Sequence, residues 1–133
     1  DNNYKKPIID HYFDQNIYDN LPNDIKNHFL TPGDIISLIN LIISLKLEIE
    51  NFDIETFLSH LIKDNIYKNK QVSINNIKIL IEMLFSSRYK DSKNENLLKL
   101  SRYFNKKFSE VVNFNLDLEI FFLEFQSKII NAK

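Results

Sequence analysis

The side chains best suited to chemistry gather in the middle of the chain, where basic and aromatic residues are interleaved. From Lys63 to Lys107 there are eleven Lys and Arg residues against four Asp and Glu, a net charge of +7. Clustered cations neutralise phosphates, and exposed rings beside them stack on unpaired bases. The pattern predicts an RNA-binding surface made of Lys68, Lys70, Arg88, Lys90, Lys93, Arg102, Lys106, Lys107, Tyr89 and Tyr103. The alternative is an ordinary solvated helix face.

The rest of the chain is acidic. From Asp1 to Ile62 the net charge is −6, from Phe108 to Lys133 it is −2, and the whole chain carries −1. An acidic first half could dock a basic protein or the positive block of a second copy. A protein scaffold or adaptor without RNA contact is therefore the second function that the charges allow.

Groups that could support catalysis do not converge in the sequence. His11, His28 and His60 lie far apart, without an HExxH pattern, and the chain has no cysteine and no glycine-rich phosphate loop. Ser86 and Ser87 have no base at a spacing typical of an activated nucleophile. We expect a protein that is not an enzyme, with no cofactor, no metal and no small-molecule substrate.

The elements that position these residues are predicted to be helices. The 133 residues include one glycine and three prolines, and 44% are hydrophobic. Sheets need glycine-rich reversals, whereas a few long helices can be joined by short Asn, Asp and Lys loops. The longest apolar region, Ile35 to Leu45, is too short to span a bilayer, so no membrane contact is expected.

Capping residues mark where the helices begin. Thr31 to Asp34 forms a capping box, and an apolar face follows from Ile35 to Ile49. Asp53, Ser73 and Asn115 are predicted to cap later helices, and one or two shorter helices precede Thr31. The polar stretch from Arg88 to Asn96 is predicted to separate the third of these helices from a fourth that spans Leu97 to Val111.

The apolar pattern also repeats along the chain. A shift of 42 residues aligns Asp34 with Asn76 and Leu38 with Leu80, and a further shift of 41 aligns Leu80 with Phe121. A period near 40 residues with two helices per unit is typical of helical solenoids. We expect one all-α domain over 1–133, a short α-solenoid of stacked helical hairpins with about six helices. Its parts are N-terminal helices (1–30), repeat 1 (31–72), repeat 2 (73–113) and a partial repeat 3 (114–133). A single irregular helical bundle is the alternative.

Two pairs of segments carry a family resemblance. They are LTPGDIISLINLIISLKL (Leu30 to Leu47) with DIETFLSHLI (Asp53 to Ile62), and VSINNIKILIEMLFSSRY (Val72 to Tyr89) with NLLKLSRYF (Asn96 to Phe104). From Leu30 onward the chain resembles the octotricopeptide and heptatricopeptide repeats of organellar proteins, which also occur beside RAP domains.

The resemblance implies an RNA-binding solenoid of mitochondria or plastids. It leads us to expect an RNA-associated component of an organellar ribonucleoprotein such as the mitochondrial ribosome. Its partners would then be RNA, ribosomal RNA included, and proteins of a large assembly. The expected location is the mitochondrial matrix or another organelle, with the cytoplasm as the alternative.

A helical-groove binder like the viral Bcl-2 proteins is a further alternative, because such proteins are all-helical and of similar size. Their groove usually carries an Asn-Trp-Gly-Arg-like turn. This chain has no tryptophan, and Gly33 is its only glycine. The composition therefore favours the repeat module over the groove binder.

Overall fold

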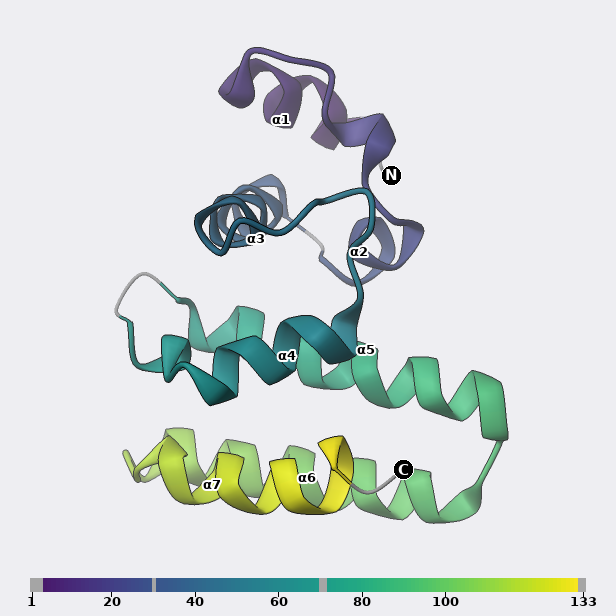
Figure 1. The fold of residues 1–133 in the computed structure, drawn as a ribbon, viewed down its shortest axis with the longest axis vertical. Coiled ribbons are helices and arrows are strands. Elements are labelled where there is room, and N and C mark those ends of the chain that lie inside the picture. Colours follow the sequence, from purple (N-terminus) through teal and green to yellow (C-terminus); the bar gives the residue numbers. More distant parts are fainter. Residues whose placement is uncertain (1–3, 30, 70–71, 132–133) are drawn as a thin grey trace. The chain divides into compact units, whose positions relative to one another are not determined.

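The computed structural model describes residues 4–29, 31–69 and 72–131, and in these ranges the chain is helical with no strand (Figure 1). The α-helices are α1 (Lys5–Phe13), α2 (Asn23–His28), α3 (Pro32–Ser44), α4 (Ile54–Lys63), α5 (Ile74–Ser92), α6 (Glu95–Asn113) and α7 (Leu118–Phe125). Short turns are η2 (Tyr18–Asn20), η3 (Ile66–Lys68) and the π-helical η4 (Gln126–Ile130). The predicted all-α class is confirmed. None of the described helices has the length and apolar character needed to cross a bilayer.

The chain divides into two compact units. Unit 1 comprises Asp1–Asp53 and Gln71–Ile79, and unit 2 comprises Ile54–Lys70 and Leu80–Lys133. Helix α5 contributes residues to both. These limits differ from those of the predicted repeats, 31–72 and 73–113, and the stacking of hairpins into a solenoid stays a prediction.

Unit 1 is built around a core of aliphatic side chains. Helices α1, α2 and α3 and the first turn of α5 each turn one face inward, and the side chains with no exposed surface are Ile9, Ile25, Phe29, Ile35, Leu38, Ile39, Ile42 and Ile77. Lys5 is also buried, and its ammonium donates hydrogen bonds to the carbonyls of Phe29 (3.2 Å) and Lys26 (3.5 Å). A buried cation is tolerated there because carbonyls at the end of α2 lack helical partners.

Asp10 closes the loop after α1. Its carboxylate accepts hydrogen bonds from the backbone N–H groups of Ile17 and Tyr18, both at 2.9 Å, and from Lys6. Burial by itself raises the pKa of the Asp10 carboxyl, but the bonds from Tyr18, Lys6 and Ile17 outweigh it and hold the pKa below its ordinary value. The ionised carboxylate thus fixes the path of the chain into η2.

Two of the predicted caps are confirmed. The Thr31 hydroxyl accepts from the Asp34 N–H at 3.1 Å, and the Ser73 hydroxyl accepts from the Asn76 N–H at 3.4 Å. The Asn76 side chain also donates to the Asp34 carbonyl at 3.5 Å, which joins two positions that the 42-residue shift aligns. The starts of α3 and α5 therefore lie side by side in unit 1.

The predicted cap at Asn115 is wrong. The Asp117 carboxylate caps α7 by accepting from the Glu119 N–H at 2.9 Å. Asn115 has a φ of 53°, and its N–H donates to the Val112 carbonyl. Asn115 therefore ends α6 instead of starting α7. Asparagine suits both positions, because it tolerates the left-handed conformation that ends helices and its side chain can also cap a helix start.

Left-handed residues other than glycine end several helices. Asp14, Lys46, Asn65, Lys93 and Asn115 all have φ between 48° and 58°. Such residues usually are glycines, so this chain accepts a small steric cost at each helix end. Lys46 also ends the apolar face that was predicted to reach Ile49, because α3 stops at Ser44.

Unit 2 has an aromatic core. The Phe104 ring lies at its centre, with ring centroids 5.3 Å from Phe125, 5.8 Å from Phe121 and 6.3 Å from Phe85. Helices α6 and α7 pack along each other and α4 packs against η4 (Figure 1). The other side chains of unit 2 that are at most 4% exposed are Phe57, Leu58, Leu61, Leu80, Ile81, Met83, Leu84, Phe108, Phe122 and Ile129. This core fixes the outward face of α6.

Candidate nucleic-acid interface

The predicted RNA-binding residues fall mainly on the end of α5 and on α6. The polar stretch from Arg88 to Asn96 was predicted to lie between helices, but α5 continues to Ser92 and α6 begins at Glu95. The Asn94 side chain caps α6 by accepting from the Asn96 N–H at 2.9 Å. Only two residues, Lys93 and Asn94, therefore separate the helices, and the basic residues are held on ordered backbone.

One face of α6 carries three cations. Lys99, Arg102 and Lys106 follow the i, i+3, i+7 spacing, which places them within an arc of about 60° and along about 10 Å of the helix. All three are exposed, whereas Phe104 and Phe108 on the opposite side are buried in the aromatic core. We call Lys99, Arg102 and Lys106 the α6 cationic face.

The α6 cationic face has no acidic partner in the part of the chain that the structure describes. Glu95 and Glu110 lie four residues from Lys99 and Lys106, the spacing of helical ion pairs, yet neither forms one. Lys90 and Lys93, at the α5–α6 turn, are likewise exposed and unpaired within the described ranges. These five cations remain available to an external anion.

Lys99 was not among the predicted residues. Its position could have been recognised in the sequence, because Lys99, Arg102 and Lys106 share one helical face once the register of α6 is fixed by Phe104 and Phe108. The prediction grouped residues by their proximity in sequence, and the face emerges from their helical spacing instead.

Arg88 is not part of this surface. Its guanidinium forms an ion pair with the Glu55 carboxylate at 2.9 Å and donates to the Ile129 carbonyl. The Arg88 side chain is only 19% exposed. The planar guanidinium has several fixed donors, so one side chain can join α4 and η4 inside unit 2. The predicted phosphate-binding role of Arg88 is replaced by a structural one.

We expect Arg88→Ala to lower the free energy of unfolding by about 1–3 kcal/mol, because it removes the guanidinium donor from both the Glu55 carboxylate and the Ile129 carbonyl. Arg88→Lys should be less destabilising, since an ammonium keeps the charge but not the two-sided geometry. Urea unfolding followed by circular dichroism measures both. The control is Lys90→Ala, two residues away and exposed. If Lys90→Ala costs as much as Arg88→Ala, the structural role of Arg88 is wrong.

Lys68 and Lys70 are two further predicted residues that do not belong to the α6 cationic face. Lys68 lies in η3, and its ammonium is 3.7 Å from the Glu119 carboxylate and 6.0 Å from the centre of the Tyr67 ring. Exposed pairs of this kind contribute little and are easily exchanged for another anion. Lys70 lies outside the described residues.

Tyr103 is already engaged with side chains of its own unit. Its hydroxyl donates to the Glu124 carboxylate at 2.8 Å, and the ammonium groups of Lys107 and Lys128 lie 5.8 Å and 5.4 Å from the ring centre. The hydrogen bond to Glu124 raises the pKa of the Tyr103 hydroxyl above its ordinary value, and the same bond lowers the pKa of the Glu124 carboxyl. Tyr103 is therefore less available for base stacking than was predicted.

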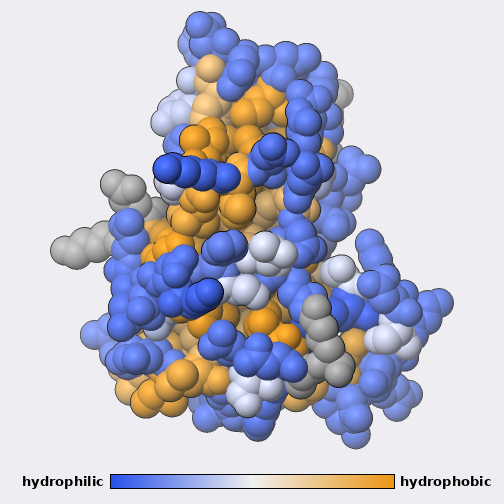
Figure 2. Space-filling model, viewed as in Figure 1, coloured by the Kyte–Doolittle hydropathy of each residue, from blue (hydrophilic) through white to orange (hydrophobic). Residues whose placement is uncertain are grey.

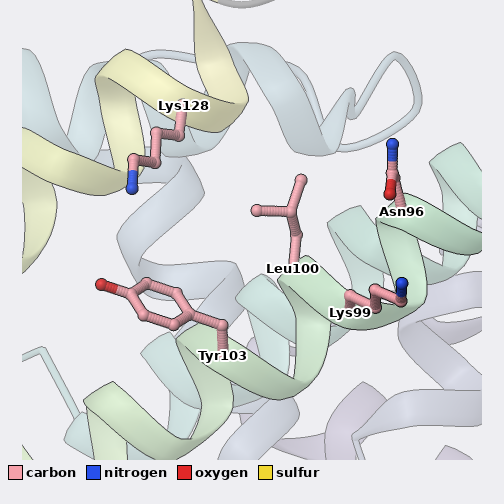
Figure 3. A pocket seen from close by; sticks show the side chains of 5 residues that line it. All are labelled: Asn96, Lys99, Leu100, Tyr103 and Lys128. Atoms are coloured by element: carbon pink, nitrogen blue, oxygen red, sulfur yellow. The ribbon is translucent and has the colours of Figure 1, made fainter.

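A shallow pocket of about 440 Å³ lies beside the cationic face, between α6 and η4. Its lining residues are Asn96, Lys99, Leu100, Tyr103 and Lys128 (Figure 3). Leu100 points from α6 into the space between α6 and η4, and the Lys128 side chain extends from η4 toward Tyr103. An apolar floor with ammonium groups on both sides can accept a flat ring that bears an anionic substituent.

Tyr89 is the predicted aromatic residue that stays open. Its side chain is 36% exposed on the last turns of α5, and the described residues offer it no ring contact. It lies next to Lys90 and one turn before Lys93. A tyrosine beside two unpaired lysines suits stacking on an unpaired base whose phosphate meets the lysines.

Comparison with protein-family models, with curated proteins and with solved structures finds no match. In the described ranges, His, Asp and Glu residues do not form a group of three that could hold a metal ion.

Proposed function

We propose that this chain is a non-enzymatic helical binding module that binds the phosphate backbone of single-stranded RNA through the α6 cationic face. The observation that carries the proposal is that Lys99, Arg102 and Lys106 share one exposed face and have no acidic partner among the described residues. Cations that serve folding are usually paired, as Arg88 is with Glu55. Three unpaired ones on one face constitute a surface for an external polyanion.

Single-stranded RNA fits better than a duplex because aromatic groups accompany the cations. Tyr89 and the apolar floor of the pocket offer stacking surfaces, which only unpaired bases can use. The contacts are to phosphates and ring faces, so sequence preference should be weak. The resemblance of the repeats extends the proposal to a component of an organellar, mitochondrial ribonucleoprotein, in which proteins of the assembly would contact other surfaces.

The test is fluorescence anisotropy of the full chain with a labelled single-stranded RNA of mixed sequence at increasing salt. A plot of the logarithm of the binding constant against the logarithm of the salt concentration should be a straight line. Its slope should be about −0.7 for each phosphate contacted. A duplex of the same sequence should bind more weakly. No binding at the lowest salt, or binding that salt does not change, would overturn the proposal.

The alternative is a protein scaffold, and co-purification distinguishes it. If the chain retains its protein partners in full after nuclease treatment and shows no affinity for RNA, the scaffold function replaces RNA binding.

A further inference from the structure

Helix α7 is apolar on two sides. Phe121, Phe122 and Phe125 are buried in the aromatic core, as expected for a helix of unit 2. On the other side, Ile120 is 74% exposed and Leu123 is 63% exposed. Removing large aliphatic side chains from water lowers the free energy. A helix with two apolar sides is therefore expected to have both sides covered, one by its own core and the other by a partner.

The exposed side continues into the turn before α7. Ile120 and Leu123 are one turn apart on α7, Leu116 (59% exposed) lies in the turn before the helix, and Phe114 (71% exposed) and Val112 (42% exposed) continue the exposed apolar run back to the end of α6. We call these five residues the α7 apolar stripe. Figure 2 shows hydrophobic side chains gathered at the lower left, where Figure 1 places the turn between α6 and α7.

The α7 apolar stripe carries no charge. Ser127 is the next residue along the same face, and the carboxylates of Asp117, Glu119 and Glu124 flank the stripe without belonging to it. Glu119 lies 3.7 Å from the Lys68 ammonium, and Glu124 is bound by Lys128 at 3.1 Å and by Tyr103. Two copies of this surface can therefore meet without repulsion between like charges.

The area suits a contact between two copies. Five large apolar side chains with these exposures present on the order of 500 Å², more than is usual for scattered surface residues. Two copies facing each other would bury about 1,000 Å², the lower limit of a specific interface. A contact of that size predicts a weak, reversible dimer.

We propose that a second copy of this chain docks on the α7 apolar stripe, with the two α7 helices antiparallel about a two-fold axis. A twofold contact requires a surface complementary to itself, and a ridge of Leu116, Ile120 and Leu123 supplies this because each side chain fits between those of the other copy. In the antiparallel arrangement, the Asp117 residues of the two copies lie on opposite sides of the axis near Ile120, so their carboxylates do not face each other. The helix dipoles are then also opposed favourably.

The absence of cysteine from the chain allows a direct test. Ile120→Cys lies near the proposed axis, so two copies in contact should form an intermolecular disulfide rapidly under mild oxidation. The matched control is Ile43→Cys on α3, where the isoleucine is 50% exposed and outside the stripe. We expect cross-linking of Ile120→Cys at least about tenfold faster than that of Ile43→Cys. Equal rates would overturn the proposal.

Sedimentation equilibrium of the unmodified chain gives an independent readout. The wild type should show a concentration-dependent dimer at micromolar to submillimolar concentrations, and Ile120→Glu should be monomeric with an unchanged helical circular dichroism spectrum. Ile43→Glu should dimerise like the wild type. A wild type that stays monomeric throughout would contradict self-association, including the case in which a different protein covers the stripe.

Discussion

Replacing Phe104 with alanine is expected to lower the free energy of unfolding by about 3–5 kcal/mol, the typical cost of removing a buried aromatic ring. Phe104 has no exposed surface, and its ring contacts those of Phe85, Phe121 and Phe125. The substitution leaves a cavity where α5, α6 and α7 meet. Because a domain of this size is stable by only about 5–15 kcal/mol, the variant should unfold far more readily.

The matched control for Phe104→Ala is Phe114→Ala. Phe114 is 71% exposed, so at concentrations where the chain is monomeric the same chemical change should alter stability by no more than about 0.5 kcal/mol. Urea titration of both variants, followed by circular dichroism, measures the difference. Similar midpoints for the two variants would show that the aromatic core does not hold unit 2 together.

Reversing the charges of the α6 cationic face is expected to weaken binding of single-stranded RNA roughly 10- to 100-fold at low salt. The variant is Lys99→Glu, Arg102→Glu and Lys106→Glu. All three side chains are exposed and without an ion pair in the described ranges, so the fold should persist. Binding weakens because each substitution removes a cation that can neutralise a phosphate, and the carboxylate that replaces it repels the RNA backbone.

The control must change the net charge equally. Lys46→Glu, Lys63→Glu and Lys78→Glu do so at exposed positions outside α6. This variant should bind more weakly only through its lower overall charge, within about threefold of the wild type. If the affinity of both triple variants falls by the same factor, binding follows net charge and not the α6 cationic face.

Much of the helical content could be predicted from the sequence. The scarcity of glycine and proline excludes many reversals, and the caps at Thr31 and Ser73 have local signatures that the structure reproduces. Local rules succeeded there because a capping hydroxyl and its N–H partner lie only three residues apart.

The predictions failed where contacts distant in sequence, or two competing local patterns, determine the structure. Polarity alone cannot separate a loop from a solvated helical turn, so the end of α5 was placed too early. At the start of α7, Asn115 and Asp117 both suit a cap, and only the geometry of the turn selects Asp117. The partners of Arg88 lie 33 and 41 residues away, which no local pattern reveals.

The same limits apply to the candidate site. The positive block was recognised from the composition of residues 63–107. In the structure, however, Arg88 pairs with Glu55 inside unit 2, and the Tyr103 hydroxyl is bound to Glu124. Lys99, which was not predicted, lies on the exposed cationic face. The sequence analysis made no prediction for Leu116, Ile120 and Leu123, because the apolar residues around α7 do not by themselves show which side is buried. Exposure becomes visible only once the phenylalanines fix which side of α7 is inside.

The most direct test of the α6 cationic face is the salt dependence of RNA affinity for a neutral variant, Lys99→Gln, Arg102→Gln and Lys106→Gln, beside the wild type. If these three side chains contact phosphates, the double logarithmic slope should become shallower by about 2, because each phosphate contact on a single strand contributes about 0.7. A slope equal to that of the wild type would place the phosphates elsewhere and contradict the proposed interface.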